Sequence, residues 1–216
     1  MTPIIRRRTA AKQNNIVIRR QPKRSIGVFI DGVGLDRASK RIGKRVSIVN
    51  LVKTITGSRE TAVIRYYTIL PNEDDSRQLS FLDSLQKQGV TIVAKRLPPK
   101  GIERQASTDA ELSTDITAFA AGFTSFEEEY RYSSEEIMEA AGVTKEAPVE
   151  TDADATPHII TVCVCRDICY PLNIARVLGA ETTATDFGDG TPQDVLRAAA
   201  KWVDLSDATT IWMDEG

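Results

Sequence analysis

The chain has 216 residues, a net charge of −2 and 41% hydrophobic residues, which is enough to build the core of one domain of ordinary size. No apolar run approaches the roughly 18 residues that a membrane-spanning helix needs, and no apolar segment of a secretory signal follows the first basic residues. Three cysteines, Cys163, Cys165 and Cys169, lie within seven residues, and we expect Cys163 and Cys165 to pack in the core from one strand. Because an odd, clustered set suits a reducing compartment better than a disulfide framework, the sequence predicts a protein of the cytoplasm.

Charge is distributed unevenly along the chain. Residues 1–45 carry 13 Lys or Arg against two acids, a net +11, and the remainder carries a net −13. Residues 1–24 hold eight basic residues and no acid, which predicts a flexible basic arm. Such an arm is either a solvated tail or a phosphate-binding segment, because Lys and Arg on a mobile chain release counterions from a polyanion. Residues 123–157 carry ten acids against two basic residues and predict an acidic insertion.

Between the charged segments, the hydrophobic pattern alternates between two periods. Apolar runs rich in β-branched residues predict five strands, at residues 26–30, 61–70, 90–94, 159–164 and 182–187. Apolar residues at helical spacing predict helices at 47–55, 76–88, from 108, at 172–178 and at 192–205, the third opened by a capping box of Thr108 and Glu111. Alternating strands and helices form parallel sheets with helices on both faces. We therefore expect a three-layer α/β domain over residues 25–216, with a mostly parallel five-stranded sheet.

Carboxylates lie at the ends of the predicted strands, where open parallel sheets bind their ligands. Asp31 and Asp186 lie at the ends of the first and fifth strands, and Asp167 follows the fourth. Asp109 and Asp115 lie in the first turns of the third helix. Clustered carboxylates stay ionised together only when a cation neutralises them, and oxygen ligands suit Mg²⁺ or Mn²⁺. Such a site can activate water for attack on a phosphodiester.

Two of these carboxylates also have an explanation that needs no ligand. Asp31-Gly32 is a common turn pair, because both residues favour tight backbone geometry. Asp109 near the start of a helix complements the helix dipole. Asp109 and Asp115 stand about 120° apart on an ideal helix. They can therefore share a site only if Asp109 belongs to the turn that enters the helix.

Four segments of the chain follow motifs that occur together in one family. Residues 28–35 read VFIDGVGL, close to F-I-D-G-x-N-L, and residues 109–115 read DAELSTD, close to D-V-x-L-x-x-D. Residues 159–178, with Tyr170-Pro171-Leu172, follow part of the pattern S-x-D-x-D-F-x-P-L, and residues 198–205 read AAAKWVDL. The order and content of these segments resemble the NYN (LabA-like) domain family of the PIN-like nuclease superfamily, over about residues 25–205.

This resemblance implies a PIN-like fold whose acids bind divalent metal and cleave RNA, although some members of the family are regulatory. For this chain it implies a ribonuclease that depends on Mg²⁺ or Mn²⁺. The resemblance gives Asp31, Asp109, Asp115 and Asp167 as the catalytic residues, and Asp31, Asp109 and Asp115 as the metal ligands.

Departures from the family pattern favour an alternative function. Gly34 stands where the family has Asn, Arg166 and Ile168 replace its two acids, and Asp167 is one residue off. Along a strand, such a shift turns the side chain to the other face, whereas in a loop Asp167 still reaches the site. The alternative is a catalytically impaired NYN domain that serves as an RNA- or protein-binding regulatory or structural subunit.

RNA is the partner that the basic residues favour, because Lys and Arg hold phosphates by charge and Arg adds a bidentate fork. A protein partner would bind through the basic arm or the acidic insertion, and the sequence leaves a homo-oligomer open. The residues that we expect to bind RNA are Arg6, Arg7, Arg8, Arg19, Arg20, Lys23, Arg24, Lys40, Arg41, Lys44, Arg45 and Arg166.

Overall fold

The structure, a computed structural model, describes residues 26–57, 62–73, 75–99, 101, 106–123 and 156–213. The predicted basic arm at residues 1–24 lies outside these residues, and so does nearly all of the predicted acidic insertion at 123–157. Among the described residues, no helix is long and apolar enough to cross a membrane.

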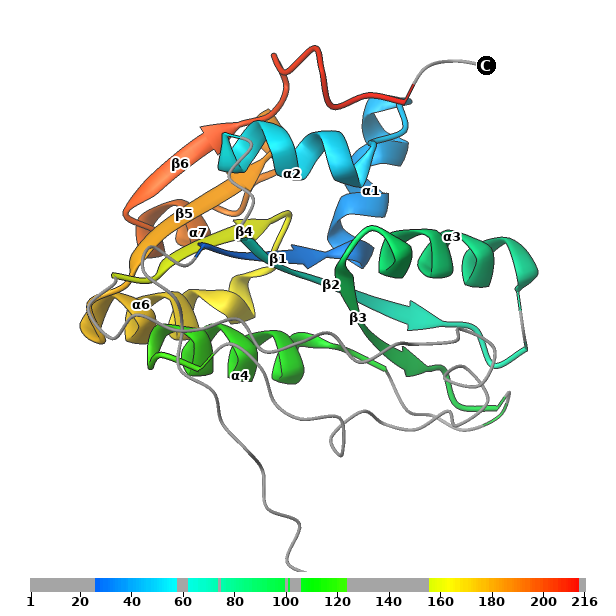
Figure 1. Ribbon diagram of the computed structural model, residues 1–216, viewed down its shortest axis with the longest axis horizontal. Helices are drawn as coiled ribbons and strands as arrows, with labels where there is room; N and C mark the ends of the chain where they lie inside the picture. Colours follow the sequence, from blue (N-terminus) through cyan, green and yellow to red (C-terminus); the bar gives the residue numbers. More distant parts are fainter. Residues whose placement is uncertain are drawn as a thin grey trace, which may run out of the picture.

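A parallel sheet forms the centre of the molecule (Figure 1). Its strand order is β3-β2-β1-β4-β5-β6, and every neighbouring pair is parallel. The central strand β1 is buried along its whole length, as expected for an apolar run in a sheet that is covered on both faces. The strands are β1 (Ile26–Asp31), β2 (Ala62–Leu70), β3 (Val90–Arg96), β4 (His158–Val162), β5 (Glu181–Asp186) and β6 (Lys201–Asp204).

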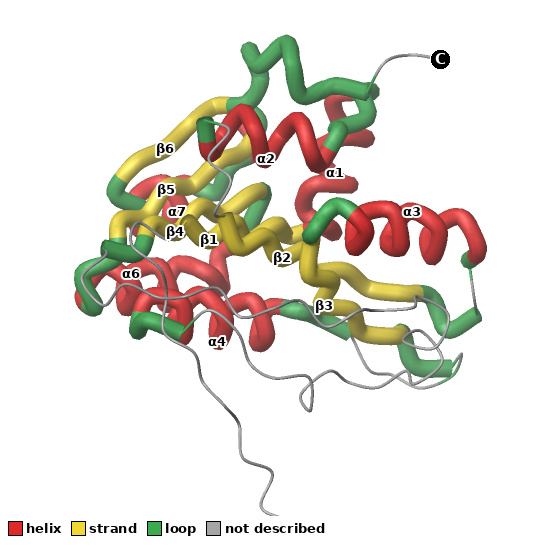
Figure 2. Tube along the Cα trace, in the orientation of Figure 1, coloured by secondary structure: helices red, strands yellow, loops and turns green. Residues whose placement is uncertain are grey.

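Helices cover both faces of the sheet, which confirms the three-layer α/β fold (Figure 2). One face carries α1 (Gly32–Ile42), α2 (Ile48–Thr56) and α3 (Ser76–Lys87). The other carries α4 (Asp109–Ala120), α6 (Cys169–Val177) and α7 (Gln193–Ala198). Two short 3-10 helices, η2 (Arg166–Ile168) and η3 (Gly188–Gly190), follow β4 and β5.

Alternate residues of β1 divide between the two cores. Val28 and Ile30 belong to the core under α1, α2 and α3. Phe29 faces the opposite core, where its ring meets Phe119 of α4 edge to face, with 5.5 Å between the centroids. The period of two along this strand therefore fixes which face each helix covers, and it fixes where Asp31 leaves the sheet.

The predicted five-stranded sheet is wrong by one strand, because the predicted helix at 192–205 splits in two. Helix α7 ends at Ala198, and the backbone of Ala199 is extended (φ −78°, ψ 150°). The amide of Ala200 donates to Thr182 Oγ1 over 2.9 Å, and the next residues pair with β5 as β6. Hydrogen bonds to the open edge of β5 thus replace the last helical turns, and Trp202 is left 40% exposed.

Two local predictions at helix starts also differ from the structure. Helix α1 was not predicted, because glycines at 32 and 34 disfavour a helix, and Asp31 begins it by accepting backbone N–H bonds. The capping box predicted at Thr108 is absent, since its side chain makes no capping hydrogen bond. Ser107 caps instead, its Oγ accepting from the amide of Asp109 over 3.0 Å.

Candidate functional site

The candidate site lies where the strand order of the sheet reverses. From β1 the chain adds β2 and β3 on one side and then returns to add β4, β5 and β6 on the other. Asp31 is the last residue of β1, and residues 163–168 follow its neighbour β4. The carboxyl ends of two strands at such a reversal are the place where open α/β sheets bind ligands.

Asp31 is a buried carboxylate whose two oxygens differ in their hydrogen bonds. Asp31 is only 5% exposed, and its Oδ1 accepts hydrogen bonds from the backbone N–H groups of Val33 and Gly34, both at 3.0 Å. Oδ1 therefore caps α1, as the turn explanation of Asp31-Gly32 expects, while Oδ2 takes part in neither bond. Burial raises the pKa of Asp31, although the N–H bond from Gly34 acts to lower it, and the charge of Asp109 raises it further. A cation at this point would relieve both effects.

Asp109, Cys165 and Asp167 form a group whose ligand atoms all lie within 4.8 Å of one another. Asp109 begins α4, and Ser107 fixes it through hydrogen bonds to its Oδ2 and its amide. The Cys165 thiol donates to Asp109 Oδ1 over 3.5 Å. Burial raises the pKa of Cys165 to about 11, so the thiol is protonated at neutral pH unless a cation displaces the proton.

Cys165 belongs to this group because β4 ends earlier than predicted. The strand stops at Val162, and Cys163 adopts a left-handed backbone (φ 54°) that is uncommon for a residue with a side chain. The chain therefore turns before Cys165: Cys163 is buried in the core under α1, α2 and α3, whereas Cys165 is half-buried and packs against the opposite core. A period-two pattern gives no sign of where a strand ends, so it does not predict that Cys165 lies beside Asp109.

Asp115 does not join the group. Its Oδ2 pairs with Arg65 Nη1 at 2.6 Å and accepts from the Tyr67 hydroxyl at 2.7 Å. The side chains of Arg65 and Asp115 are each 12% exposed, and burial keeps the pKa of Tyr67 well above its usual range. The charge of Asp115 is therefore matched by a buried partner between α4 and β2, and among the described residues Asp115 belongs to no group of three metal-ligating side chains.

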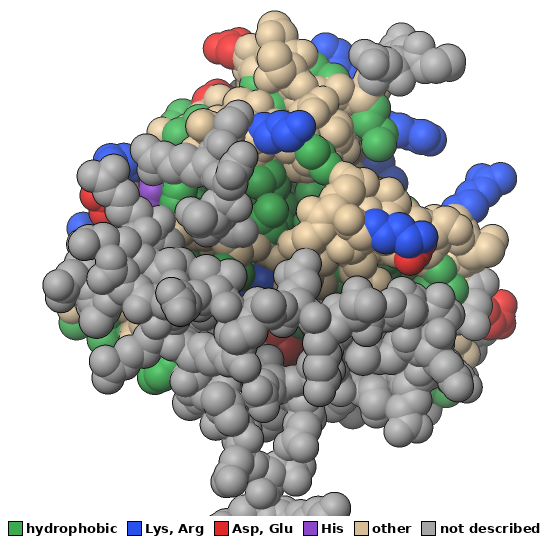
Figure 3. All heavy atoms as spheres, in the orientation of Figure 1, with side chains coloured by type: hydrophobic (Ala, Val, Ile, Leu, Met, Phe, Trp, Pro, Cys, Tyr) green, Lys and Arg blue, Asp and Glu red, His purple; other side chains and the backbone are tan. Residues whose placement is uncertain are grey.

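Helix α1 carries basic residues, and Figure 3 shows Lys and Arg side chains over the part of the molecule that α1, α2 and α3 cover. Arg37 acts on Asp31 through its charge and was not among the predicted RNA-binding residues. Arg41 donates from Nη2 to the carbonyl of Phe187 over 3.1 Å. Lys44 stands over the Trp212 ring, 5.1 Å from its centroid.

The other predicted RNA-binding residues differ in their surroundings. Lys40 pairs with Asp36 at 2.7 Å on an exposed face of α1. Arg166 points to Asp194, with Nε 3.4 Å from Oδ2, and its side chain is 75% exposed. Arg45 is exposed after α1. The seven residues of the basic arm lie outside the described residues, so their role stays a prediction.

Gly34 is at the tightest contact of the site. An added Cβ would overlap the carbonyl oxygen of Cys163 and lie 2.9 Å from Asp31 Oδ2. Helix α1 thus lies against the turn after β4, with no room for a side chain between them. The departure from Asn at this position follows from that close approach.

Comparisons with known proteins agree with this architecture. Residues 25–124 match the family model described as NYN domain. No curated protein matches the chain. A solved protein of unknown function from Vibrio parahaemolyticus shares the fold with a TM-score of 0.62 and 14% identity, over 88% of this chain and 97% of that chain. The family match ends before β4, whereas the shared fold continues past it.

We predict that Asp115→Asn lowers the free energy of unfolding by about 3 kcal/mol, because it leaves the Arg65 guanidinium buried without its carboxylate. Urea denaturation measures this loss. Asp83→Asn removes an exposed pair with Lys87 and should change stability by less than about 1 kcal/mol. A stable Asp115→Asn protein that no longer responds to Mn²⁺ would instead make Asp115 a metal ligand.

We also predict that Gly34→Asn destabilises the protein by about 1–3 kcal/mol, because the new side chain pushes α1 away from the Cys163 carbonyl. The midpoint of urea denaturation reports this change. Lys40→Ala, on the exposed side of the same helix, should stay within about 0.5 kcal/mol of the wild type. If Gly34→Asn were as stable as the wild type, the close approach would not explain the missing Asn.

Proposed function

Residues 25–124 belong to the NYN domain family, a PIN-like nuclease family, and on that premise we propose that the protein is a divalent-metal-dependent ribonuclease. The observation that carries the proposal is the buried Asp31 carboxylate at the strand-order reversal, on which the charge of Asp109 acts. Two carboxylates that repel one another, one of them buried, form a site for a cation. RNA is the proposed substrate because α1, which begins at Asp31, carries basic residues, and Arg37 among them acts on Asp31 through its charge.

The donor set fits a divalent ion that prefers oxygen. Asp109 and Asp167 offer carboxylates within one group that includes the Cys165 thiol, and Asp31, which lies outside that group, offers Oδ2. Carboxylates suit both Mg²⁺ and Mn²⁺, and a neighbouring sulfur favours Mn²⁺ of the two. Asp31, Asp109 and Asp167 are the residues that we propose to hold the ion, which differs from the predicted ligand set by Asp167 in place of Asp115.

In the mechanism that follows, the side chains have separate roles. A bound divalent ion would supply an activated water and neutralise charge on the phosphodiester. Asp31 is held rigidly, since its Oδ1 is fixed by two backbone N–H groups, so its Oδ2 is oriented before substrate arrives. Asp109 is fixed in the same way by Ser107. Arg37, exposed on α1, would contact the phosphate that approaches Asp31.

A second candidate function is an RNA-binding domain without hydrolysis. The observation that favours it is the segment after β4, where the two acids of the family pattern are absent. Ile168 is fully buried and offers no ligand, and Arg166 pairs with Asp194. Asp167 is then the one carboxylate that this segment brings to the group, and it is exposed.

We predict that the full-length protein cleaves labelled single-stranded RNA in the presence of Mn²⁺ and that Asp31→Asn lowers the rate at least about 100-fold. Asn keeps the N-cap of α1, so the variant should remain folded. Asp75→Asn is a matched control, because Asp75 caps α3 with the same N–H bonds, to Arg77 and Gln78, on an exposed surface.

Three outcomes separate the two functions. Cleavage by the wild type and by Asp75→Asn, with loss in Asp31→Asn, supports the ribonuclease. Equal cleavage by Asp31→Asn would place catalysis elsewhere and contradict it. RNA binding without cleavage by any of the three proteins, at several Mn²⁺ concentrations, would contradict the ribonuclease and support the binding domain.

Metal binding can be predicted without reference to activity. Mn²⁺ at 100 times its dissociation constant should stabilise the wild type by about 2.7 kcal/mol, because it binds the folded state alone. Asp31→Asn should abolish this shift in a thermal denaturation series, whereas Asp75→Asn should retain it. An undiminished shift in Asp31→Asn would remove Asp31 from the ligand set.

A further inference from the structure

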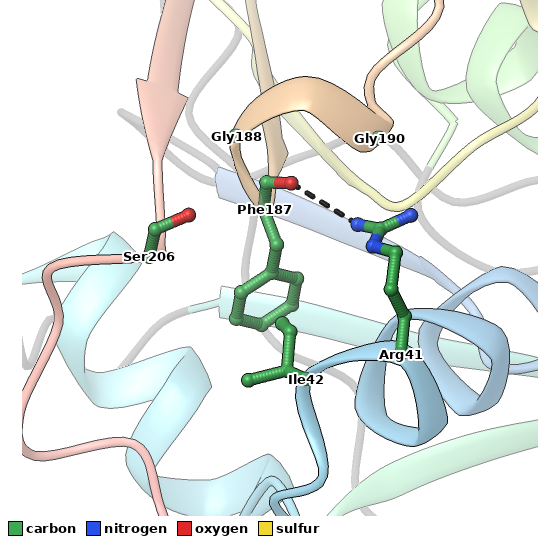
Figure 4. A pocket seen from close by; sticks show the side chains of 6 residues that line it. All are labelled: Arg41, Ile42, Phe187, Gly188, Gly190 and Ser206. Atoms are coloured by element: carbon green, nitrogen blue, oxygen red, sulfur yellow. Dashed lines mark hydrogen bonds between the residues drawn. The ribbon is translucent and has the colours of Figure 1, made fainter.

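A hollow of about 410 Å³ lies between the end of α1 and the η3 turn (Figure 4). Three separate parts of the chain line it: the end of α1, the turn from β5 into η3, and Ser206, which follows β6. The lining residues are Arg41, Ile42, Phe187, Gly188, Gly190 and Ser206. Its volume is in the range of small-molecule and nucleotide sites.

One wall of the hollow is built around the Arg41 guanidinium. Nη2 donates to the Phe187 carbonyl over 3.1 Å, and Figure 4 shows the guanidinium directed at the η3 turn. A Cβ at Gly190 would overlap this guanidinium, so Gly190 leaves the space that the guanidinium occupies. The Phe187 carbonyl engages one nitrogen of a group with five N–H donors, and Arg41 is exposed. The other N–H groups of the Arg41 guanidinium can therefore donate to an anion in the hollow.

The opposite wall carries a hydroxyl with a carboxylate behind it. The Asp204 carboxylate accepts backbone N–H bonds from Gly188 at 2.9 Å and Ser206 at 2.8 Å. Hydrogen bonds from Ser206, led by its hydroxyl, lower the pKa of Asp204, so this carboxylate is ionised at neutral pH. The Ser206 hydroxyl thus donates to Asp204 and presents its oxygen as an acceptor.

Cys163 connects the hollow with Asp31. Its buried thiol donates to Asp186 Oδ1 over 3.5 Å, and Asp31 and Arg41 both act on it through their charges. Strand β5, which ends beside the hollow, is two strands from β1, a separation of roughly 10 Å at ordinary strand spacing. A short piece of RNA chain spans that distance.

We propose that this hollow seats a ribonucleotide of the RNA substrate next to the scissile phosphate, with Arg41 binding its phosphate and Ser206 accepting from its ribose 2′-hydroxyl. The proposal rests on the proposed function and deepens it. A guanidinium fork matches phosphate oxygens in pairs. A fixed acceptor across the hollow provides a means of telling RNA from DNA, because the 2′-hydroxyl is the group by which the two differ.

Gly190→Ala is the sharpest variant for a test, because the added methyl displaces the tip of a flexible side chain and leaves the net charge unchanged. The backbone of Gly190 is not left-handed, so alanine is tolerated there. The readout is fluorescence anisotropy of a labelled single-stranded RNA on the full chain carrying Asp31→Asn, in Mn²⁺ buffer at fixed salt. This background measures binding without cleavage.

We expect Gly190→Ala and Arg41→Ala each to weaken RNA binding about 10-fold, and Arg77→Ala, an exposed arginine of α3, to leave it within twofold. We expect Ser206→Ala to reduce the preference for RNA over DNA of the same sequence. Unchanged RNA affinity in Gly190→Ala and Arg41→Ala would overturn the proposal. Equal RNA preference in Ser206→Ala and its parent would overturn the assignment of the 2′-hydroxyl to Ser206.

The failure of this proposal differs from that of the proposed function. If the wild type cleaves RNA and Arg41→Ala binds RNA as tightly as its parent, the hollow fails and the ribonuclease stands. If the wild type does not cleave RNA but Gly190→Ala loses affinity, the ribonuclease fails and the hollow stands as an RNA-binding site.

Discussion

The burial of the Asp31 carboxylate is the constraint on which the site depends. Strand β1 is covered on both faces, and its last residue, Asp31, is only 5% exposed. Two amides of α1 hold Oδ1, which joins the start of the helix to the end of the strand. The same burial raises the pKa of Asp31, and Asp109 adds to that shift. The Asp31 carboxylate thus caps α1 while its negative charge is unfavourable at a buried position, and a cation would neutralise that charge.

The second constraint is the close approach of α1 to the turn after β4. Cys163 takes a left-handed backbone there, and its carbonyl meets Gly34 without space for a Cβ. A strained residue at a crevice is a common feature of binding sites, where the surrounding structure maintains the strain. Here it ends β4 early and places Cys165 beside Asp109. The charges of Asp31 and Arg41 both act on the buried Cys163 thiol, so Asp31 and the Arg41 hollow share one structural element.

The positions and parallel arrangement of the first five strands follow from apolar runs, because a strand buried on both faces needs them. The sequence did not indicate α1, since its only strong start signal is Asp31 and two glycines follow. It did not indicate β6 either, because pairing with β5 overrides the helical spacing of the apolar residues there. Asp31, Asp109 and Asp167 were predictable from their places after strands and at a helix start. Cys165 and Arg37 were not, because one depends on where β4 ends and the other on a helix without a periodic signal. Asp115 shows the opposite limit, since a motif spacing does not reveal that Arg65 and Tyr67 already satisfy a carboxylate.

The central claim is that Asp31 and Asp109 hold a divalent ion at the reversal of the strand order. Crystals soaked in Mn²⁺ and measured at the manganese absorption edge test it most directly, because the anomalous signal locates the ion independently of the ligands. The account predicts an anomalous peak between Asp31 Oδ2 and the carboxylates of Asp109 and Asp167, with the Cys165 thiol nearby. A peak at Asp115, or none within reach of Asp31 at saturating Mn²⁺, would contradict it.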